Sequence, residues 1–275
     1  MIGKTVLHYR ILQEIGRGAM AIVFKAEDQA AGRTVALKIM KEKLADEPEM
    51  LYRFEREAEA AARLHHPHIC TVYESGNWLG RPYLAMELLT GQTLAERLAA
   101  GPLPPGMVME IAIEVAGALE ASHALGVVHR DIKPANLFLT TSGHVKVLDF
   151  GLAKVRQPRP VSDSPTATVF ITRPGTLLGT LAYMSPEQIR CEAVDGRADL
   201  YSLGVVLYEL ATGELPARGS EHGPALPWGL APIVHRMMEI DPARRYASAS
   251  EAREALQACA AGEAFQRCGT RPALG

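Results

Sequence analysis

Two short segments hold the residues best suited to chemistry: His129-Arg130-Asp131-Ile132-Lys133-Pro134-Ala135-Asn136 and Asp149-Phe150-Gly151. Magnesium prefers hard oxygen ligands and keeps several waters, so the carboxylate of Asp149 and the amide oxygen of Asn136 could hold it together with phosphate groups. Asp131 would then be left to accept a proton, and Lys133 could neutralise charge on a transferred group. The joint spacing favours this site over ordinary turn chemistry.

A glycine-rich segment, Gly16-Arg17-Gly18-Ala19-Met20-Ala21, lies between two predicted strands. Its glycines would let a hairpin fold closely over phosphates without Cβ clashes, although the segment alone is equally compatible with an ordinary hairpin turn. It is no dinucleotide-binding fingerprint, because a strand rather than a helix follows. Ala21 replaces a third glycine, and we expect a cost on the order of 1 kcal/mol if that position needs a positive φ.

Strand alternation in Val35-Ala36-Leu37-Lys38 places Ala36 and Lys38 on one face, beneath the glycine-rich segment. A lysine on an inward face needs an anion, and Glu57 on a predicted helix could supply it. Glu55 and Glu59 are alternatives that helical periodicity does not fully exclude. For Lys38 or Glu57 taken alone, a solvated surface charge is the simpler interpretation.

These segments require elements that position them. Strand character covers residues 10–15, 22–27, 34–40, 69–74 and 81–88, and an amphipathic helix is predicted over residues 47–64. After Thr90-Gly91-Gln92 the pattern turns helical, over residues 93–100, 105–125, 185–190, 197–212, 231–239 and 248–261, with short strands at 136–140 and 144–148. We therefore predict an α+β chain with a small β-rich lobe containing one helix (1–89), a larger, mainly α lobe (90–262) and a loose tail (263–275).

The composition excludes several function classes. The 275 residues are 48% hydrophobic and 22% charged, which is typical of a globular chain. A formal net charge of -2 without a basic stripe argues against a nucleic-acid partner. The four scattered cysteines indicate neither a disulfide framework nor a zinc site and favour a reducing, cytoplasmic setting. No signal peptide or membrane segment is visible.

Taken together, these motifs resemble those of the eukaryotic-like (Hanks-type) serine/threonine protein kinases, with the closest similarity to bacterial members. The resemblance covers about residues 9–261 and includes Gly179-Thr180-Leu181-Ala182-Tyr183-Met184-Ser185-Pro186-Glu187. Lys133, and Thr180 before Tyr183, match the serine/threonine rather than the tyrosine branch. The resemblance implies the two-lobed protein kinase fold and transfer of the ATP γ-phosphate to Ser/Thr hydroxyls of proteins.

The resemblance also implies a role for individual residues. Lys38, held by Glu57, would bind the α- and β-phosphates, while Asp131, with Lys133 nearby, would orient or deprotonate the acceptor hydroxyl. Asn136 and Asp149 would hold Mg²⁺, or alternatively Mn²⁺. The other ATP-binding positions would be Ile15, Gly16, Gly18, Val23, Ala36, Met86, Glu87, Leu89 and Phe138, with Met86 as gatekeeper and the backbones of Glu87 and Leu89 contacting the purine. Structural roles would fall to His129, Phe150, Glu187, Asp199 and Arg245.

Arg130, immediately before Asp131, is the family's sign of control by phosphorylation of the loop between Asp149 and Glu187. The candidate phosphosites in that loop are Thr172 and Thr176, followed by Thr168 and Thr166. The expected partners are protein substrates that the sequence does not identify, and the sequence leaves open a homodimer formed through the N-lobe.

Two other function classes compete with an active protein kinase. A pseudokinase would bind and signal without transferring phosphate; the short segment between Leu210 and Asp241 favours it, but Lys38, Asp131 and Asp149 are all retained. A small-molecule phosphotransferase of related fold is disfavoured by Ser185-Pro186-Glu187 and the threonine-containing loop before it, which belong to enzymes with protein substrates.

Overall fold

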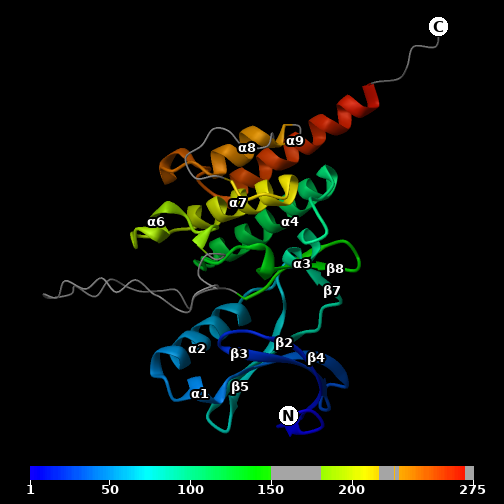
Figure 1. Cartoon of the computed structure of the whole chain (residues 1–275), viewed down its shortest axis with the longest axis vertical. Coiled ribbons are helices and arrows are strands. Elements are labelled where there is room, and N and C mark those ends of the chain that lie inside the picture. The colour runs from blue at the N-terminus through cyan, green and yellow to red at the C-terminus, as the bar shows by residue number, and fades with distance from the viewer. Residues whose placement is uncertain (150–180, 217–225, 227–228, 270–275) are drawn as a thin grey trace, which may run out of the picture.

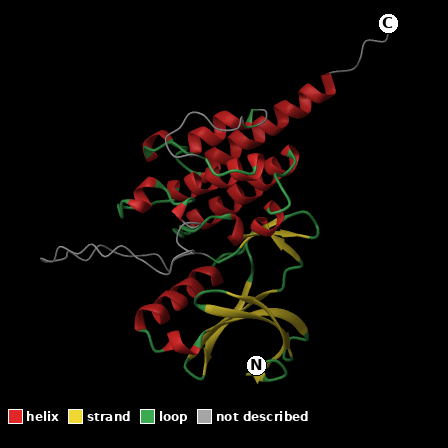
Figure 2. Ribbon diagram, viewed as in Figure 1, coloured by secondary structure: helices red, strands yellow, loops and turns green. Residues whose placement is uncertain are grey.

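The chain folds into two lobes, a small one rich in strands and a larger one built mainly of helices (Figures 1 and 2). The computed structural model describes residues 1–149, 181–216, 226 and 229–269. The predicted α+β, two-lobed architecture is confirmed. The chain passes from the first sheet to the second between Glu87 and Gly91, next to the boundary expected at residues 89 and 90.

The N-terminal lobe is an antiparallel sheet of six strands in the order β1-β2-β3-β4-β6-β5. The strands are β1 (Thr5–Val6), β2 (Tyr9–Arg17), β3 (Ala21–Asp28), β4 (Arg33–Met40), β5 (Val72–Trp78) and β6 (Arg81–Glu87). On β4, Val35, Leu37 and Ile39 are fully buried in the apolar core of this lobe, which side chains of several strands form together. The register pairs Val23 with Gly16 on one side and with Lys38 on the other. This pairing places the glycine-rich segment next to the strand that carries Lys38.

The helix predicted over residues 47–64 is α2 (Pro48–Ala62), which begins with a proline at its first turn. Its Phe54 and Ala58 are buried against Met40 and Leu84 of the sheet. A second helix precedes it, α1 (Glu42–Ala45), so the expectation of one helix in this lobe is wrong. A four-residue helix is too short to show a hydrophobic period in the sequence.

The C-terminal lobe packs around two helices that are buried on most sides, α4 (Pro105–Ala124) and α7 (Arg197–Thr212). The other helices are α3 (Leu94–Leu98), the 3₁₀ turn η1 (Pro134–Asn136), α6 (Pro186–Ile189), α8 (Leu230–Met237), the 3₁₀ turn η3 (Pro242–Arg244) and α9 (Ala249–Gly269). A small antiparallel sheet of β7 (Gly91–Thr93), β8 (Leu137–Thr140) and β9 (Val145–Val147) faces the first lobe. The segment 129–136 precedes β8, and Asp149 follows β9.

Two segments depart from the predictions by more than a shift of a few residues at an end. Residues 263–269 were expected in a loose tail, but they continue α9, whose C-terminal end projects beyond the other helices in Figure 1. Glu, Ala, Gln and Arg in this stretch are good helix formers, and the glycine at 262 weakens the helix without ending it. The strand expected over 69–74 begins only at Val72, because Ile69 and Cys70 pair with Val147 of β9 instead.

None of the helices in the described part of the chain combines the length and the apolar character that a membrane span requires.

Candidate active site

A cation and a carboxylate meet across the two lobes. Lys38 Nζ, on β4, donates to Asp149 Oδ1 at 2.7 Å, and Asp149 lies just after β9. The Lys38 side chain is 12% exposed, whereas that of Asp149 is 47% exposed. The lysine is therefore shielded beneath the sheet while the carboxylate remains open to a ligand.

The predicted catalytic loop, residues 129–136 and called the catalytic loop below, has several hydrogen bonds to Asp131. Asp131 Oδ2 accepts hydrogen bonds from Lys133 Nζ at 2.8 Å and from Asn136 Nδ2 at 3.0 Å. Asn136 Nδ2 also donates to the backbone oxygen of Asp131 at 2.9 Å, and the Asn136 backbone oxygen accepts from Leu148 N at 2.8 Å. The predicted base, its neighbouring cation and the predicted amide ligand thus form one cluster, linked to the strand end that carries Asp149.

A buried carboxylate anchors the backbone of this loop. Asp199, fully buried at the start of α7, accepts from His129 N at 2.8 Å and from Arg130 N at 2.7 Å, one bond on each carboxylate oxygen. His123 Nε2 lies 2.8 Å from the same carboxylate. His129, also fully buried, uses Nδ1 to accept from Asp131 N and places Nε2 2.9 Å from the oxygen of Leu148. Asp199 and His129 therefore fix both the catalytic loop and the start of the second segment.

Two residues of the site have a backbone conformation that favours glycine. Arg130 has φ +65° and Asp149 has φ +43°. For residues with a Cβ, this left-handed region costs about 1–3 kcal/mol, and such strain persists only where the surrounding structure imposes it. Here the Asp199 and His129 hydrogen bonds flank both strained positions.

The roof of the site is formed by the glycine-rich segment, residues 16–21, and the strands on either side of it. Ala36 is buried on the same face of β4 as Lys38, Val23 is half-buried, and Ile15 is 45% exposed. Gly18 N donates to Ala21 O at 3.0 Å, which closes the turn. Ala21 begins β3 and does not have a positive φ, so the strain cost expected for an alanine at this position does not arise.

The segment after Met86 connects the lobes. The Glu87 carboxylate accepts from Thr71 N at 2.6 Å and from Lys146 Nζ, on β9, at 2.7 Å. Its side chain is thereby held away from a purine, and only backbone groups of Glu87 and of half-buried Leu89 remain candidates for purine contacts. Phe138 alternates with buried Leu137 and Leu139 on β8 and so faces away from the helical core.

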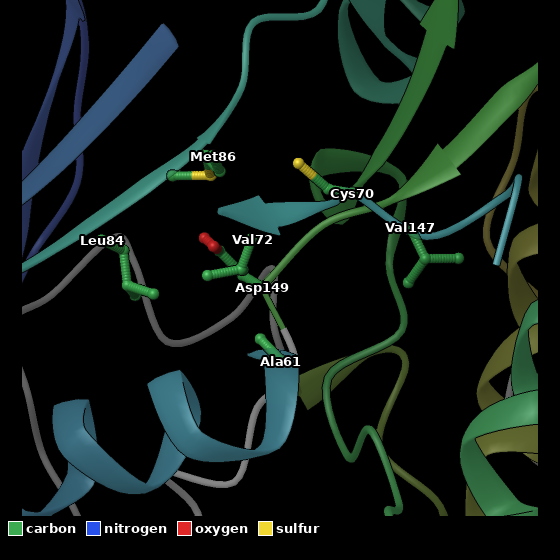
Figure 3. Close-up of a pocket in the computed structure, with 7 residues that line it drawn as sticks. All are labelled: Ala61, Cys70, Val72, Leu84, Met86, Val147 and Asp149. Atoms are coloured by element: carbon green, nitrogen blue, oxygen red, sulfur yellow. The ribbon is translucent and has the colours of Figure 1, made fainter. Parts of the chain in front are cut away.

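A small cavity lies behind Met86 and is shown in Figure 3. Its volume is about 20 Å³, and Cys70 and Asp149 line it together with Ala61, Val72, Leu84, Met86 and Val147. Burial, reinforced by the negative charges of Glu87 and Asp149, raises the pKa of the Cys70 thiol to about 12. The cavity wall is therefore apolar and unreactive at neutral pH, apart from Asp149.

The predicted pair of Glu187 and Arg245 is a two-pronged, buried ion pair. Arg245 Nη1 and Nη2 donate to Glu187 Oε1 and Oε2 at 2.6 and 2.8 Å. Backbone oxygens of Arg197, Glu239 and Ile240 accept its remaining donors. Gln188, the next residue, donates from Nε2 to Arg130 O at 2.9 Å. The ion pair thus fixes the start of α6, and Gln188 connects that helix to the catalytic loop.

Several predicted residues lie outside the described residues or side chains. Phe150 and the candidate phosphosites Thr166, Thr168, Thr172 and Thr176 fall within 150–180. Glu57 is placed in the middle of α2, but its side chain is not described, so its pairing with Lys38 remains a prediction.

Some contacts at the site were not predicted from the sequence. Lys41 reaches the glycine-rich segment, Lys146 holds Glu87, and His123 and Gln188 support the catalytic loop. Each joins segments far apart in the sequence, and for Lys41 and Gln188 the acceptor is a backbone oxygen, which no residue type reveals. Only the sheet register and the helix packing bring these groups together.

The donors near Asp149 fit a magnesium ion. Asn136 Nδ2 donates to Asp131, so Asn136 Oδ1 is the amide atom that could bind the metal. Asp149 supplies a half-exposed carboxylate. Both are the hard oxygen ligands that Mg²⁺ prefers, and one carboxylate with one amide suits an ion that shares its shell with phosphates and water.

The family model for the protein kinase domain matches residues 9–274. The probable serine/threonine-protein kinase SCO3848 of Streptomyces coelicolor is 40% identical, and the match covers 93% of this chain and 40% of that protein. Serine/threonine-protein kinase PknB of Mycobacterium leprae is 36% identical, with 90% and 42% covered. This chain therefore spans about 40% of the length of these relatives.

Solved structures show the same fold. The crystal structure of the Mycobacterium tuberculosis PknI kinase domain superposes with a TM-score of 0.72 at 30% sequence identity, and the match covers 94% of this chain and 98% of that one. The likeness thus includes both lobes and the site between them. The chain belongs to the protein kinase family, and its two-lobed domain is of the serine/threonine type found in bacteria.

Proposed function

We propose that this protein is an active kinase that transfers the γ-phosphate of ATP to serine and threonine hydroxyls of proteins. The observation that carries the proposal is the placement of Asp131, whose carboxylate is 17% exposed and receives hydrogen bonds from Lys133 and Asn136. These three side chains occupy one loop beside Asp149, which Lys38 contacts from the other lobe. ATP and Mg²⁺ are the standard cosubstrate and metal of the family.

Asp131 would act on the acceptor. Its carboxylate can accept a hydrogen bond from the substrate hydroxyl and take the proton as the hydroxyl oxygen forms its bond to the γ-phosphorus. The bond from that phosphorus to the β,γ-bridging oxygen breaks in the same transfer, and ADP leaves with the electron pair. Lys133, within hydrogen-bond distance of Asp131, can neutralise charge on the transferred group.

Lys38 and the strand end would position the phosphates. The Lys38 ammonium has three donors, one of which donates to Asp149 at 2.7 Å, and on ATP binding the ammonium would also donate to the α- and β-phosphates. Mg²⁺, held by Asn136 and Asp149, would neutralise negative charge on the phosphates. Ile15, Gly16, Gly18, Val23 and Ala36 would cover the nucleotide, with Met86, Glu87, Leu89 and Phe138 around the purine.

The first experiment is transfer of labelled phosphate from γ-labelled ATP with Mg²⁺, comparing the unaltered chain with Asp131→Asn. We expect the substitution to lower the rate by about 10²–10⁴-fold, the usual contribution of a positioned acid–base group. Asp46→Asn, at an exposed position after α1, is the matched control and should retain full activity. Equal labelling of the unaltered chain and Asp131→Asn would refute the role of Asp131. No labelling of either protein, with ATP still bound, would refute the kinase proposal in favour of a pseudokinase.

The same samples test regulation. We propose that the enzyme phosphorylates its own loop, with Thr172 and Thr176 as the favoured sites and Thr168 and Thr166 as the next candidates. Mass spectrometry of residues 150–180 should find phosphate on one of these threonines in the unaltered protein and none in Asp131→Asn. Phosphate only at other positions would contradict the assignment.

We further propose that the domain works in the cytoplasm as a homodimer joined through its N-lobe. The cytoplasm supplies ATP, and free thiols such as Cys70 and Cys191 suit a reducing compartment. The N-lobe exposes Ile2, Leu7 and Leu79 to 66%, 54% and 82%, and a contact between copies would bury these apolar side chains. Sedimentation of the chain should show a dimer that Leu7→Asp with Leu79→Asp dissociates; a monomer at all concentrations would contradict this.

A further inference from the structure

The tip of the glycine-rich segment is held by a lysine from outside that segment. Lys41 follows the last residue of β4, and its Nζ donates to the backbone oxygens of Gly18 at 2.5 Å and Ala19 at 3.0 Å. Its own N–H donates to Met20 O at 2.9 Å. One residue therefore binds the carbonyl groups of three consecutive residues at the tip.

These contacts orient the peptide groups of the segment. In a planar trans peptide unit, the carbonyl of one residue and the N–H of the next point in opposite directions. Because Lys41 Nζ holds the carbonyls of Gly18 and Ala19, the N–H groups of Ala19 and Met20 are turned away from Lys41. The turn itself is closed by the bond from Gly18 N to Ala21 O, so neither of these two N–H groups closes it.

Backbone N–H groups that point the same way form a site for phosphate oxygens. The sheet register brings this segment next to β4, where Lys38 lies one strand away from Gly16, with Val23 paired to both. Phosphates held by Lys38 would therefore lie near the segment. A lysine suits the side of the tip that faces away from the phosphates, because its three donors can bind two carbonyls at once.

We propose that Lys41 is a positioning residue that directs the N–H groups of Ala19 and Met20 toward the phosphates of ATP. This inference rests on the proposed kinase activity and deepens it. Lys41 acts on the phosphates alone, because its contacts lie at the tip and none involves Met86, Glu87 or Leu89. Removing the ammonium should weaken the binding of nucleotides with phosphates and leave adenosine binding unchanged.

The test compares Lys41→Met with Lys43→Met, an exposed lysine two residues further along on α1. The binding of Mg²⁺–ADP and of adenosine is measured by calorimetry, and the kinetics with ATP by labelled transfer. We expect Lys41→Met to weaken ADP binding and raise KM for ATP on the order of tenfold, which corresponds to one hydrogen bond with a charged donor, with a smaller change in kcat. Lys43→Met should match the unaltered chain.

Lys41→Arg keeps the charge and several donors, so it should restore much of the ADP affinity and guards against misfolding of the methionine variant. Equal loss of ADP and adenosine binding in Lys41→Met would show a general structural role and overturn the inference. Unchanged ADP binding would overturn it as well. Both outcomes leave phosphate transfer by the unaltered chain intact, so a failure here is distinct from a failure of the kinase proposal.

Discussion

The two loops that would meet ATP are held in opposite ways. The catalytic loop is tied to Asp199, which is fully buried and accepts from two consecutive backbone N–H groups. The tip of the glycine-rich segment is tied to Lys41, a partly exposed side chain just after the end of β4. Replacing the partly exposed contacts of Lys41 by water costs less free energy than replacing the buried contacts of Asp199. The predicted chemical centre, here called the fixed side, is thus held by buried contacts, whereas the glycine-rich segment predicted to cover the phosphates, here called the cover, is held by partly exposed ones.

On the fixed side of the site, we expect the largest loss of stability when Arg245 is replaced. Arg245→Met would leave the Glu187 carboxylate, 4% exposed, without its counter-charge at the start of α6. We expect the free energy of unfolding to fall by about 3–5 kcal/mol, as measured by urea denaturation. Arg244→Met, at the exposed neighbouring position, is the control. Equal losses in the two variants would contradict a special role for the buried pair.

A second substitution tests whether the two loops affect different kinetic constants. Asp199→Asn keeps the shape of the side chain but replaces one acceptor oxygen with an NH₂ group that faces a backbone donor. We expect kcat to fall by about 10²-fold, because the catalytic loop shifts, while KM for ATP stays unchanged. Lys41→Met should show the reverse pattern. Glu254→Gln, at an exposed position on α9, serves as control, and a rise in KM as large as the fall in kcat would refute the separation.

We expect the smallest effect on stability from an exposed ion pair in the C-terminal lobe. His144, in the turn between β8 and β9, places Nδ1 2.7 Å from Glu114 Oε1, and Glu114 Oε2 accepts from Val145 N. The hydrogen bond to Glu114 and its negative charge raise the pKa of His144, with a smaller contribution from Glu110. The pair therefore contributes stability in full below the ordinary histidine value of about 6.5 and loses it as the pH rises through the pKa of the folded protein.

NMR titration of the His144 ring tests this contact. Glu114→Gln should bring its pKa down toward the ordinary value, whereas Glu110→Gln should change it little. His68 Nδ1 also lies 3.4 Å from Glu114, so its ring is followed in the same spectra. A His144 pKa that does not move in Glu114→Gln would show that the ion pair is absent in solution.

The sequence predicted the fixed side of the site better than the cover. The chemistry predicted for Asp131, Asn136 and Asp149 uses their side chains, and these residues lie close in the sequence on either side of the β8–β9 hairpin. Residue types therefore sufficed to predict the cluster that Asp131 and Asn136 form in the structure. Strand alternation likewise placed Lys38 on the inner face. Most of the longer strands and helices followed from hydrophobic periods. The exceptions are α1, β1 and β7, which are too short to have one, and the extension of α9.

The cover was less accessible to sequence analysis, because its contacts use the backbone. The carbonyls that Lys41 binds exist at every residue, so only the register of β3 and β4 shows that this lysine reaches them. The same holds for Glu87, whose side chain accepts from Thr71 N and Lys146 Nζ, two contacts that residue types do not reveal. The expectation of strain at Ala21 depended on a backbone angle that composition does not reveal.

The left-handed backbones at Arg130 and Asp149 set selection for stability against selection for catalysis. Glycine at either position would relieve about 1 kcal/mol or more of strain, yet it would delete a charged group of the site. A population evolved only for thermal resistance should therefore accumulate glycine or asparagine at these two positions and lose activity. The strained backbones of Arg130 and Asp149 therefore indicate that these positions were selected for activity and not for stability alone.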